Sequence, residues 1–157
     1  MKINTRVFGE VDIEESKILT FPGGIVGFPD MTRFTLIHDE EKGSKSIKWM
    51  QSVDEPNFAM PVMDPLLVLD GYNPVVDDEL LAPIGDLSGE NMLVLVTVSI
   101  PKGNLEDMTV NLKGPIVINT DTRKAVQVIA DGDTYGVKYP IYEILKKKKE
   151  EAEKAGE

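Results

Sequence analysis

Few side chains in this sequence are of the types that perform catalysis or bind metal ions. His38 is the only histidine and there is no cysteine, so a zinc site made from these residues is excluded, and a serine nucleophile would depend on this one imidazole. His38 follows a strand-like segment and precedes a polar one, which is typical of an ordinary surface histidine. Scattered aspartates are the other candidates for a carboxylate pair or a cation site, and their spacing matches no calcium loop: Asp30, Asp64, Asp70, Asp77 and Asp78. The residue types therefore predict a non-enzymatic protein with no cofactor and no metal site.

A glycine-rich segment near the N-terminus is the clearest motif. Gly23-Gly24-Ile25-Val26-Gly27 lies between Phe21-Pro22 and Phe28-Pro29, and such glycines and prolines favour tight bends. The segment lacks the G-x-G-x-x-G spacing of a dinucleotide site, the Lys-Ser/Thr pair of a P-loop and a following helix. It indicates a shaped loop that is either structural or partner-facing.

A second unusual segment contains the only tryptophan. In a strand, Trp49, Gln51 and Val53 share one face, whereas Met50 and Ser52 share the other. Trp49 favours a core position because burial of an indole is a large hydrophobic gain. Gln51 and Ser52 fit a core less well. Methionines in and after this segment either fill the core or line an adaptable recognition surface: Met50, Met60 and Met63.

The size of the chain fits one domain. It has 157 residues, of which 41% are hydrophobic, and a chain of this length buries roughly 70% of its unfolded surface on folding. The first residues lack the apolar core of a secretory signal, and no apolar run approaches the roughly 18 residues that cross a bilayer. We expect a cytoplasmic protein without membrane contact.

Acidic charge is concentrated in the body of the chain. The net charge is −10, and residues 146–157 hold five Lys against four Glu, so residues 1–145 carry −11. Such a surface repels phosphate backbones and attracts basic partners over roughly 8 Å at physiological salt. Direct binding to nucleic acid is therefore not expected. The acidity suits a basic protein partner or serves solubility alone.

Short apolar segments between turn residues predict an all-β fold. Met108–Leu112 alternates in polarity, and Met92–Val98 is almost continuously apolar, as expected for a central strand covered on both faces. A hairpin is expected from Ile116 to Ile129. The other expected strands are Ile3–Phe8, Lys17–Phe21, Phe34–His38, Ile47–Val53 and Phe58–Met63. Ten prolines and thirteen glycines spread between them favour a single-domain antiparallel β-barrel or sandwich.

Helical signal is confined to two places. Asp77-Asp78 can cap a short turn that Pro83 ends. Pro140 suits the first turn of a short, charged C-terminal helix. We therefore divide the chain into a β-barrel-like domain, residues 1–138, and a charged helical tail, residues 139–157. Charge and proline at strand edges predict a monomer.

Several separated sequence blocks carry a family resemblance. They are Thr5–Glu10, Ile18–Phe28, Trp49–Val53, Ala59–Pro65 and Met108–Asn119, the last followed by Arg123–Val128. In this order they resemble the FliW family of bacterial flagellar assembly factors. The chain departs from the family at Gly24-Ile25-Val26-Gly27, where Gly-Leu-Pro-Gly is the familiar form.

This resemblance implies a β-barrel-like fold, no enzymatic activity and two protein partners. One partner is flagellin. The other is the CsrA-type translational regulator, a small basic RNA-binding dimer that represses flagellin synthesis. Flagellin in the cytoplasm occupies a FliW-like protein; once flagellin is exported, the freed protein binds the regulator and translation resumes. This requires only binding that is mutually exclusive or negatively coupled.

We expect the partner surface to combine the glycine-rich loop with the tryptophan segment and the acidic residues that follow it. The predicted partner-binding residues are Phe21, Gly23, Gly24, Phe28, Trp49, Gln51, Ser52, Asp54 and Glu55. Two alternatives stay open. An enzyme built on acidic residues needs a concave site with convergent carboxylates of shifted pKa. A flagellin chaperone or adaptor would bind flagellin without contacting the regulator.

Overall fold

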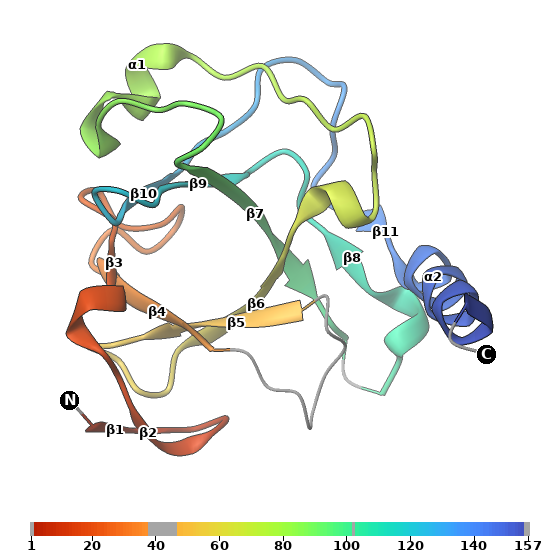
Figure 1. Cartoon of the computed structure of the whole chain (residues 1–157), viewed down its shortest axis with the longest axis horizontal. Coiled ribbons are helices and arrows are strands. Elements are labelled where there is room, and N and C mark those ends of the chain that lie inside the picture. The colour runs from red at the N-terminus through yellow and green to blue at the C-terminus, as the bar shows by residue number, and fades with distance from the viewer. Residues whose placement is uncertain (1, 38–46, 102, 156–157) are drawn as a thin grey trace.

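A closed ring of strands forms the centre of the molecule (Figure 1). The computed structural model describes residues 2–37, 47–101 and 103–155, so His38 lies outside the described residues. Within them, seven strands follow the order β7-β6-β5-β4-β3-β10-β9, and β9 pairs back onto β7. The predicted all-β barrel is confirmed. The ring strands are β3 (Leu19–Thr20), β4 (Arg33–Ile37), β5 (Ile47–Ser52), β6 (Ala59–Met63), β7 (Met92–Ser99), β9 (Ile116–Asn119) and β10 (Lys124–Gln127).

The pairing in this ring is antiparallel with one exception. β3 and β10 run parallel, with Lys124 opposite Thr20. Strands that follow one another in sequence pair in β4–β5, β5–β6 and β9–β10, the last two through short connections. The parallel pair and the β7–β9 pair join distant parts of the sequence, and these two pairings close the barrel.

Apolar side chains of the ring strands and of the loop after β3 fill the barrel interior. Phe21 and Phe34 are fully buried, with ring centroids 5.3 Å apart in an edge-to-face arrangement. Burying each such side chain contributes about 1.5–3 kcal/mol. The interior cluster comprises Leu19, Phe21, Ile25, Phe34, Met50, Val62, Leu95, Ile116, Ile118 and Ala125.

β7 is covered on both faces, as its apolar run predicts. Leu95 belongs to the interior cluster, whereas the next residue, Val96, belongs to an outer cluster. β7 pairs with β9 through Met92–Leu95 and with β8 (Thr109–Val110) through Val98 and Ser99. The predicted alternation of Met108–Leu112 is confirmed, because Met108, Val110 and Leu112 are buried.

The C-terminal helix begins later than the sequence suggests. Pro140 ends β11 (Tyr139–Pro140), which pairs with β8, so its placement in a helical turn is wrong. Ile141 is fully buried and holds the chain on the barrel before α2 (Tyr142–Ala155) starts. The boundary at residue 138 stays a prediction, since packing against the outer cluster continues through Leu145.

Short helical elements connect several of the strands. α1 (Asp78–Leu81) is capped by Asp77, whose side chain accepts a hydrogen bond from the Glu79 amide, as the sequence predicts. The 3₁₀ turn η3 (Ala82–Ile84) follows. Three further 3₁₀ turns in the described ranges are η1 (Glu15–Lys17), η2 (Pro65–Leu67) and η4 (Leu105–Asp107). No helix among the described residues is long and apolar enough to cross a membrane.

The N-terminal segment is a hairpin and not one long strand. β1 (Lys2–Thr5) pairs with β2 (Gly9–Asp12), so the strand predicted over Ile3–Phe8 is wrong beyond Thr5. Gly9 has a φ of +67°, which a turn requires and a continuing strand does not. The hairpin contacts the barrel through Phe8, whose ring centroid lies 5.9 Å from that of Trp49.

Candidate partner-binding surface

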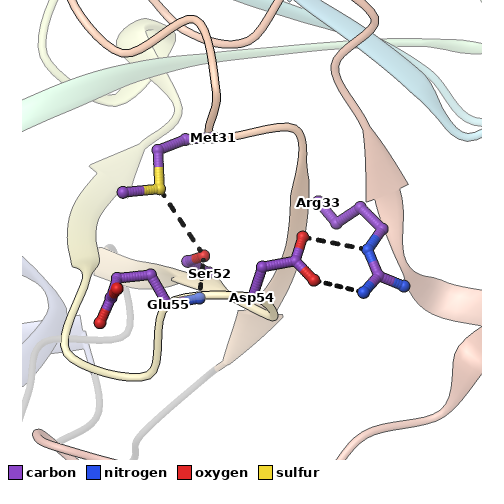
Figure 2. A network of polar contacts seen from close by, with 5 residues as sticks. All are labelled: Met31, Arg33, Ser52, Asp54 and Glu55. Atoms are coloured by element: carbon purple, nitrogen blue, oxygen red, sulfur yellow. Dashed lines mark hydrogen bonds and ion pairs between the residues drawn. The ribbon is translucent and has the colours of Figure 1, made fainter.

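Two segments predicted to form a partner surface lie side by side. One is the loop between β3 and β4, and the other is the turn between β5 and β6. Phe28 from the loop and Phe58 from the turn have ring centroids 5.2 Å apart. Figure 2 shows a second contact, in which the Ser52 hydroxyl lies 4.0 Å from the Met31 sulfur. We call this region the Phe28 surface; its exposed members are Val26, Phe28, Asp30, Asp54 and Glu55.

Backbone hydrogen bonds hold the loop in one shape. The Phe21 amide donates to the Thr32 carbonyl at 2.7 Å and closes its base. The Ile25 amide donates to the Phe28 carbonyl at 3.2 Å, and the Phe28 amide returns a bond to the Ile25 carbonyl at 2.8 Å. These bonds form a tight turn through Gly27, which has a φ of +85°.

The loop is also held by residues distant in sequence. The Val26 amide donates to Gln127 Oε1 at 3.0 Å, and Gln127 Nε2 donates to the Gly114 carbonyl at 3.1 Å. Ile25 is buried in the barrel, whereas Val26 and Phe28 are 55% and 48% exposed. The loop thus inserts one apolar side chain into the core and presents two others to solvent in a prearranged geometry.

Gly24 is the position in this loop where a side chain cannot fit. Its φ is +70°, and an added Cβ would lie 2.6 Å from the Phe28 carbonyl oxygen and 2.6 Å from the Pro29 carbonyl carbon. Gly23 has neither restriction, because nothing lies within 4 Å of an added Cβ. The two adjacent glycines therefore have different roles.

Gln51 fixes the turn between β5 and β6 through hydrogen bonds from a buried side chain. The side chain is fully buried, and its Nε2 donates to the carbonyls of Ser52, Pro56 and Phe58 at 3.0, 3.1 and 3.1 Å. Its Oε1 has no hydrogen-bond partner among the residues the structure describes. Ser52 adds a bond, since its hydroxyl accepts from the Glu55 amide at 3.0 Å. A buried amide that bonds three carbonyls of one turn fixes that turn.

An ion pair ties the turn to the neighbouring strand. Arg33 on β4 binds both carboxylate oxygens of Asp54, with Nε 3.1 Å from Oδ2 and Nη2 bound to Oδ1 (Figure 2). The hydrogen bond from Arg33 holds the pKa of Asp54 below its usual range and raises the pKa of the guanidinium. Both side chains are about half exposed, so this pair orients the turn more than it stabilises the fold.

The structure separates the predicted residues into exposed and buried groups. Exposed and available for contact are Gly23, Phe28, Asp54 and Glu55. Buried and able to act only by shaping the surface in this conformation are Phe21, Gly24, Gln51 and Ser52. Trp49 is half-buried beside Phe8 of the hairpin. Whether a partner contacts the exposed group stays a prediction.

Sequence reasoning did not identify some residues of this surface. Val26 lies at the tip of the tight turn, and its apolar character between glycine-rich neighbours was an available signal. Phe58, Met31 and Arg33 gave no such signal, because their contacts with Phe28, Ser52 and Asp54 depend on strand register.

The hollow next to this surface does not have the arrangement of a carboxylate enzyme. It has a volume of about 410 Å³ and is lined by Glu15, Ile18, Thr20, Arg33, Thr122 and Arg123. One carboxylate beside two guanidinium groups is not a convergent carboxylate pair. No group of three or more His, Asp or Glu side chains within the described ranges is placed to hold a metal ion. The geometry suits binding through apolar and charged contacts.

Comparisons with known proteins agree on one family. The family model described as "FliW protein" matches residues 2–141. The chain is 48% identical over 149 residues to the flagellar assembly factor FliW of Lachnospira eligens, covering 94% of this chain and 98% of that protein. It is 46% identical over 156 residues to the protein of the same name from Lachnoclostridium phytofermentans, covering 98% and 99%.

A solved structure agrees with the sequence matches. It is described as the crystal structure of the flagellar assembly factor FliW, and it superposes with a TM-score of 0.81 at 28% identity, covering 90% of this chain and 96% of that one. The matched residues include the barrel and both segments of the Phe28 surface. The chain therefore belongs to the FliW family.

Proposed function

We propose that this chain is a cytoplasmic, non-enzymatic flagellar assembly factor that works by binding two proteins in turn. It holds flagellin before export. When flagellin leaves, the freed protein binds and antagonises the CsrA-type translational regulator, so that flagellin synthesis follows flagellum assembly. The names of the relatives support the assembly role, and the family resemblance supports the two partners.

The observation that carries this proposal is the prearranged Phe28 surface on an acidic protein. Phe28 is half exposed although it is aromatic, and the loop that presents it is fixed at both ends. Exposed aromatic side chains on rigid loops are typical anchors of protein interfaces. The body charge of −11 favours encounter with a basic regulator and disfavours direct contact with nucleic acid.

The test is a titration of the purified protein with monomeric flagellin and, separately, with the CsrA-type regulator of the same organism. Phe28→Ala should weaken binding of at least one partner by roughly tenfold, or about 1.4 kcal/mol. Leu80→Ala is the matched control, because Leu80 on α1 is 46% exposed against 48% for Phe28 and lies outside the Phe28 surface. The control should bind both partners as the unmodified protein does.

The two candidate modes of action give different results. A preformed complex with flagellin should bind the regulator more weakly than the free protein does, because the proposal requires negative coupling. Binding of flagellin alone would favour a chaperone or adaptor role. Binding of neither partner would overturn the proposal.

A further inference from the structure

Gln127 joins two distant parts of the barrel without belonging to the Phe28 surface. It lies on β10 opposite Ile116 of β9, beside the loop between β3 and β4 (Figure 1). Its Oε1 accepts a hydrogen bond from the Val26 amide at 3.0 Å, and its Nε2 donates to the Gly114 carbonyl at 3.1 Å. One side-chain amide therefore links that loop to the chain between β8 and β9.

The two neighbours of this amide determine its orientation. The Val26 N–H can only donate and the Gly114 carbonyl can only accept, so one of the two possible amide orientations satisfies both groups. Gly114 is itself held, because its amide donates to Asn111 Oδ1 at 2.9 Å. The Asn111 amide in turn donates to the Thr97 carbonyl of β7 at 3.0 Å. The oxygen of Gln127 is thus aimed at the loop from a fixed support.

Few other hydrogen bonds tie this loop to the rest of the barrel. Within the described part of the chain, two such bonds join residues 21–32 to other segments. One is the bond from the Val26 amide to Gln127, and the other runs from the Ser52 hydroxyl to the Met31 sulfur at 4.0 Å. Sulfur is a weak acceptor, so the bond to Gln127 is the stronger of the two.

Side-chain packing does not replace this bond at the tip of the loop. Ile25 is buried in the core, but the next side chain, Val26, is 55% exposed. The backbone at Val26 is therefore placed by its hydrogen bond and not by burial of its side chain. Phe28 follows two residues later, so the position of its ring depends on where Val26 is held.

We propose that Gln127 is a positioning residue for the Phe28 surface. Without touching a partner, its amide holds the loop in the shape that binds, and it thereby sets the affinity for the partner that Phe28 contacts. A loop that is already ordered loses less conformational freedom on binding. The inference rests on the function proposed above and deepens it, because it requires a partner that binds at this surface.

Gln127→Met is the variant that removes the link. Methionine is unbranched and of similar length, but it has no donor and only a weak acceptor. The surrounding strand pairing should survive, because it depends on backbone bonds. The Val128 amide donates to the Pro115 carbonyl at 3.0 Å, and the Ala130 amide donates to the Lys113 carbonyl at 2.8 Å.

A second variant displaces the same amide without removing it. In Gly114→Ala, the added Cβ would lie 3.3 Å from Gln127 Nε2 and 3.0 Å from Asn111 Nδ2, so both amides must shift slightly. Tyr72→Phe is the matched control. It also removes one side-chain hydrogen bond, from the Tyr72 hydroxyl to the Leu112 carbonyl, and it lies outside the Phe28 surface.

The first measurement needs no partner and uses amide NMR signals of the full chain. In Gln127→Met, the Val26 amide proton should move upfield and exchange with solvent roughly tenfold faster. The amides of Ile25 and Phe28 should change less, because they bond to each other's carbonyls. Gly114→Ala should move the Val26 signal in the same direction by a smaller amount, and Tyr72→Phe should leave it in place.

The second measurement is a titration with the partner whose binding Phe28→Ala weakens. Gln127→Met should lower the affinity by roughly three- to tenfold, whereas Tyr72→Phe should bind as the unmodified protein does. In a Phe28→Ala background, Gln127→Met should have a smaller effect, because a loop without its aromatic side chain gains little from being held in place. A general loss of stability would not depend on Phe28 in this way.

Three results would overturn the inference. The first is a Val26 signal that stays in place in Gln127→Met, and the second is an affinity of Gln127→Met equal to that of Tyr72→Phe. The third is an equal effect of Gln127→Met with and without Phe28. If Gln127→Met fails to fold, Gly114→Ala decides by the same measurements. An unmodified protein that binds neither partner refutes the proposed function as well, whereas normal binding that Gln127→Met leaves unchanged refutes this inference alone.

Discussion

Gly24 and Gly23 provide the sharpest test of how the Phe28 surface is built. At Gly24, alanine would have to adopt a φ of +70°, which costs an L-residue about 1–2 kcal/mol. Its Cβ would also meet the backbone of Phe28 and Pro29, each at 2.6 Å. Relieving such overlap costs about 1–3 kcal/mol. Gly24→Ala should therefore lower the free energy of unfolding by about 3 kcal/mol.

Gly23→Ala is the matched control one residue away. An added Cβ there has nothing within 4 Å and no positive φ, so the free energy of unfolding should change by less than about 0.5 kcal/mol. Urea unfolding followed by Trp49 fluorescence measures both variants. For a chain of this length, 3 kcal/mol corresponds to a fall of about 6–12 °C in Tm.

The comparison refutes the reasoning if the two variants differ by less than about 1 kcal/mol. That outcome would mean that the loop relaxes to another shape at little cost. It would then also remove the argument that Phe28 is presented by a rigid loop. The comparison requires that Gly23→Ala stays as stable as the unmodified protein. A loss of stability in both variants would mean that any substitution in this segment is destabilising, and not that Gly24 has a special role.

Other residues give predictions of their own. Gln51→Glu places a carboxylate beside three carbonyl oxygens in a fully buried site. The variant should have a free energy of unfolding lower by several kcal/mol, measured as a lower urea midpoint. A change under about 1 kcal/mol would contradict the role of Gln51 in fixing the turn. Asp54→Asn should cost only about 0.5 kcal/mol near neutral pH, because the pair with Arg33 is half exposed. The pKa of Asp54 is lowered in the folded protein. The difference in unfolding free energy between the unmodified protein and Asp54→Asn should therefore be present above the ordinary aspartate pKa of about 4, and it should disappear as the pH falls through the lowered pKa of the folded state. A difference that persists in acid would contradict the role of this ion pair. Tyr72→Phe removes the hydroxyl that donates to the Leu112 carbonyl at 2.6 Å and should cost about 1 kcal/mol below pH 10. Burial raises the pKa of Tyr72 to about 12. The unmodified protein should therefore lose more stability than the variant as the pH rises from about 10 toward 12. An equal dependence of the two proteins on pH in this range would rule this out.

Local sequence signals predicted the individual elements well. The apolar run of β7, the alternation of Met108–Leu112 and the aspartate cap of α1 depend on residues close together in the chain. Two local expectations were wrong. Residues up to Phe8 have strand-like character, yet Gly9 turns the chain back, and Pro140 fits a first helical turn in isolation but pairs through β11 because Ile141 is drawn into the core.

The pairing of strands that are far apart in the sequence could not be predicted from the sequence. Nothing near Thr20 indicates that Lys124 will lie opposite it, or that β9 will pair with β7. The proximity of the glycine-rich loop and the turn after β5 was predicted as a hypothesis from family motifs, and their contact is present. The burial of Gln51 was not foreseen, because the carbonyls that accept from its Nε2 belong to its own turn and leave no signal in the linear sequence.

The hydrogen bond from the Val26 amide to Gln127 has a consequence for biosynthesis. The two residues are 101 positions apart, and β3 likewise waits for β10 before it gains its parallel neighbour. On the ribosome, the glycine-rich loop emerges early but acquires this anchor only after Gln127 has left the exit tunnel. Contacts of such large sequence separation form late and slow folding. A nascent or truncated chain that stops short of β10 therefore lacks the anchored form of this loop, and the prearranged shape of the Phe28 surface should arise only after β10 has been made.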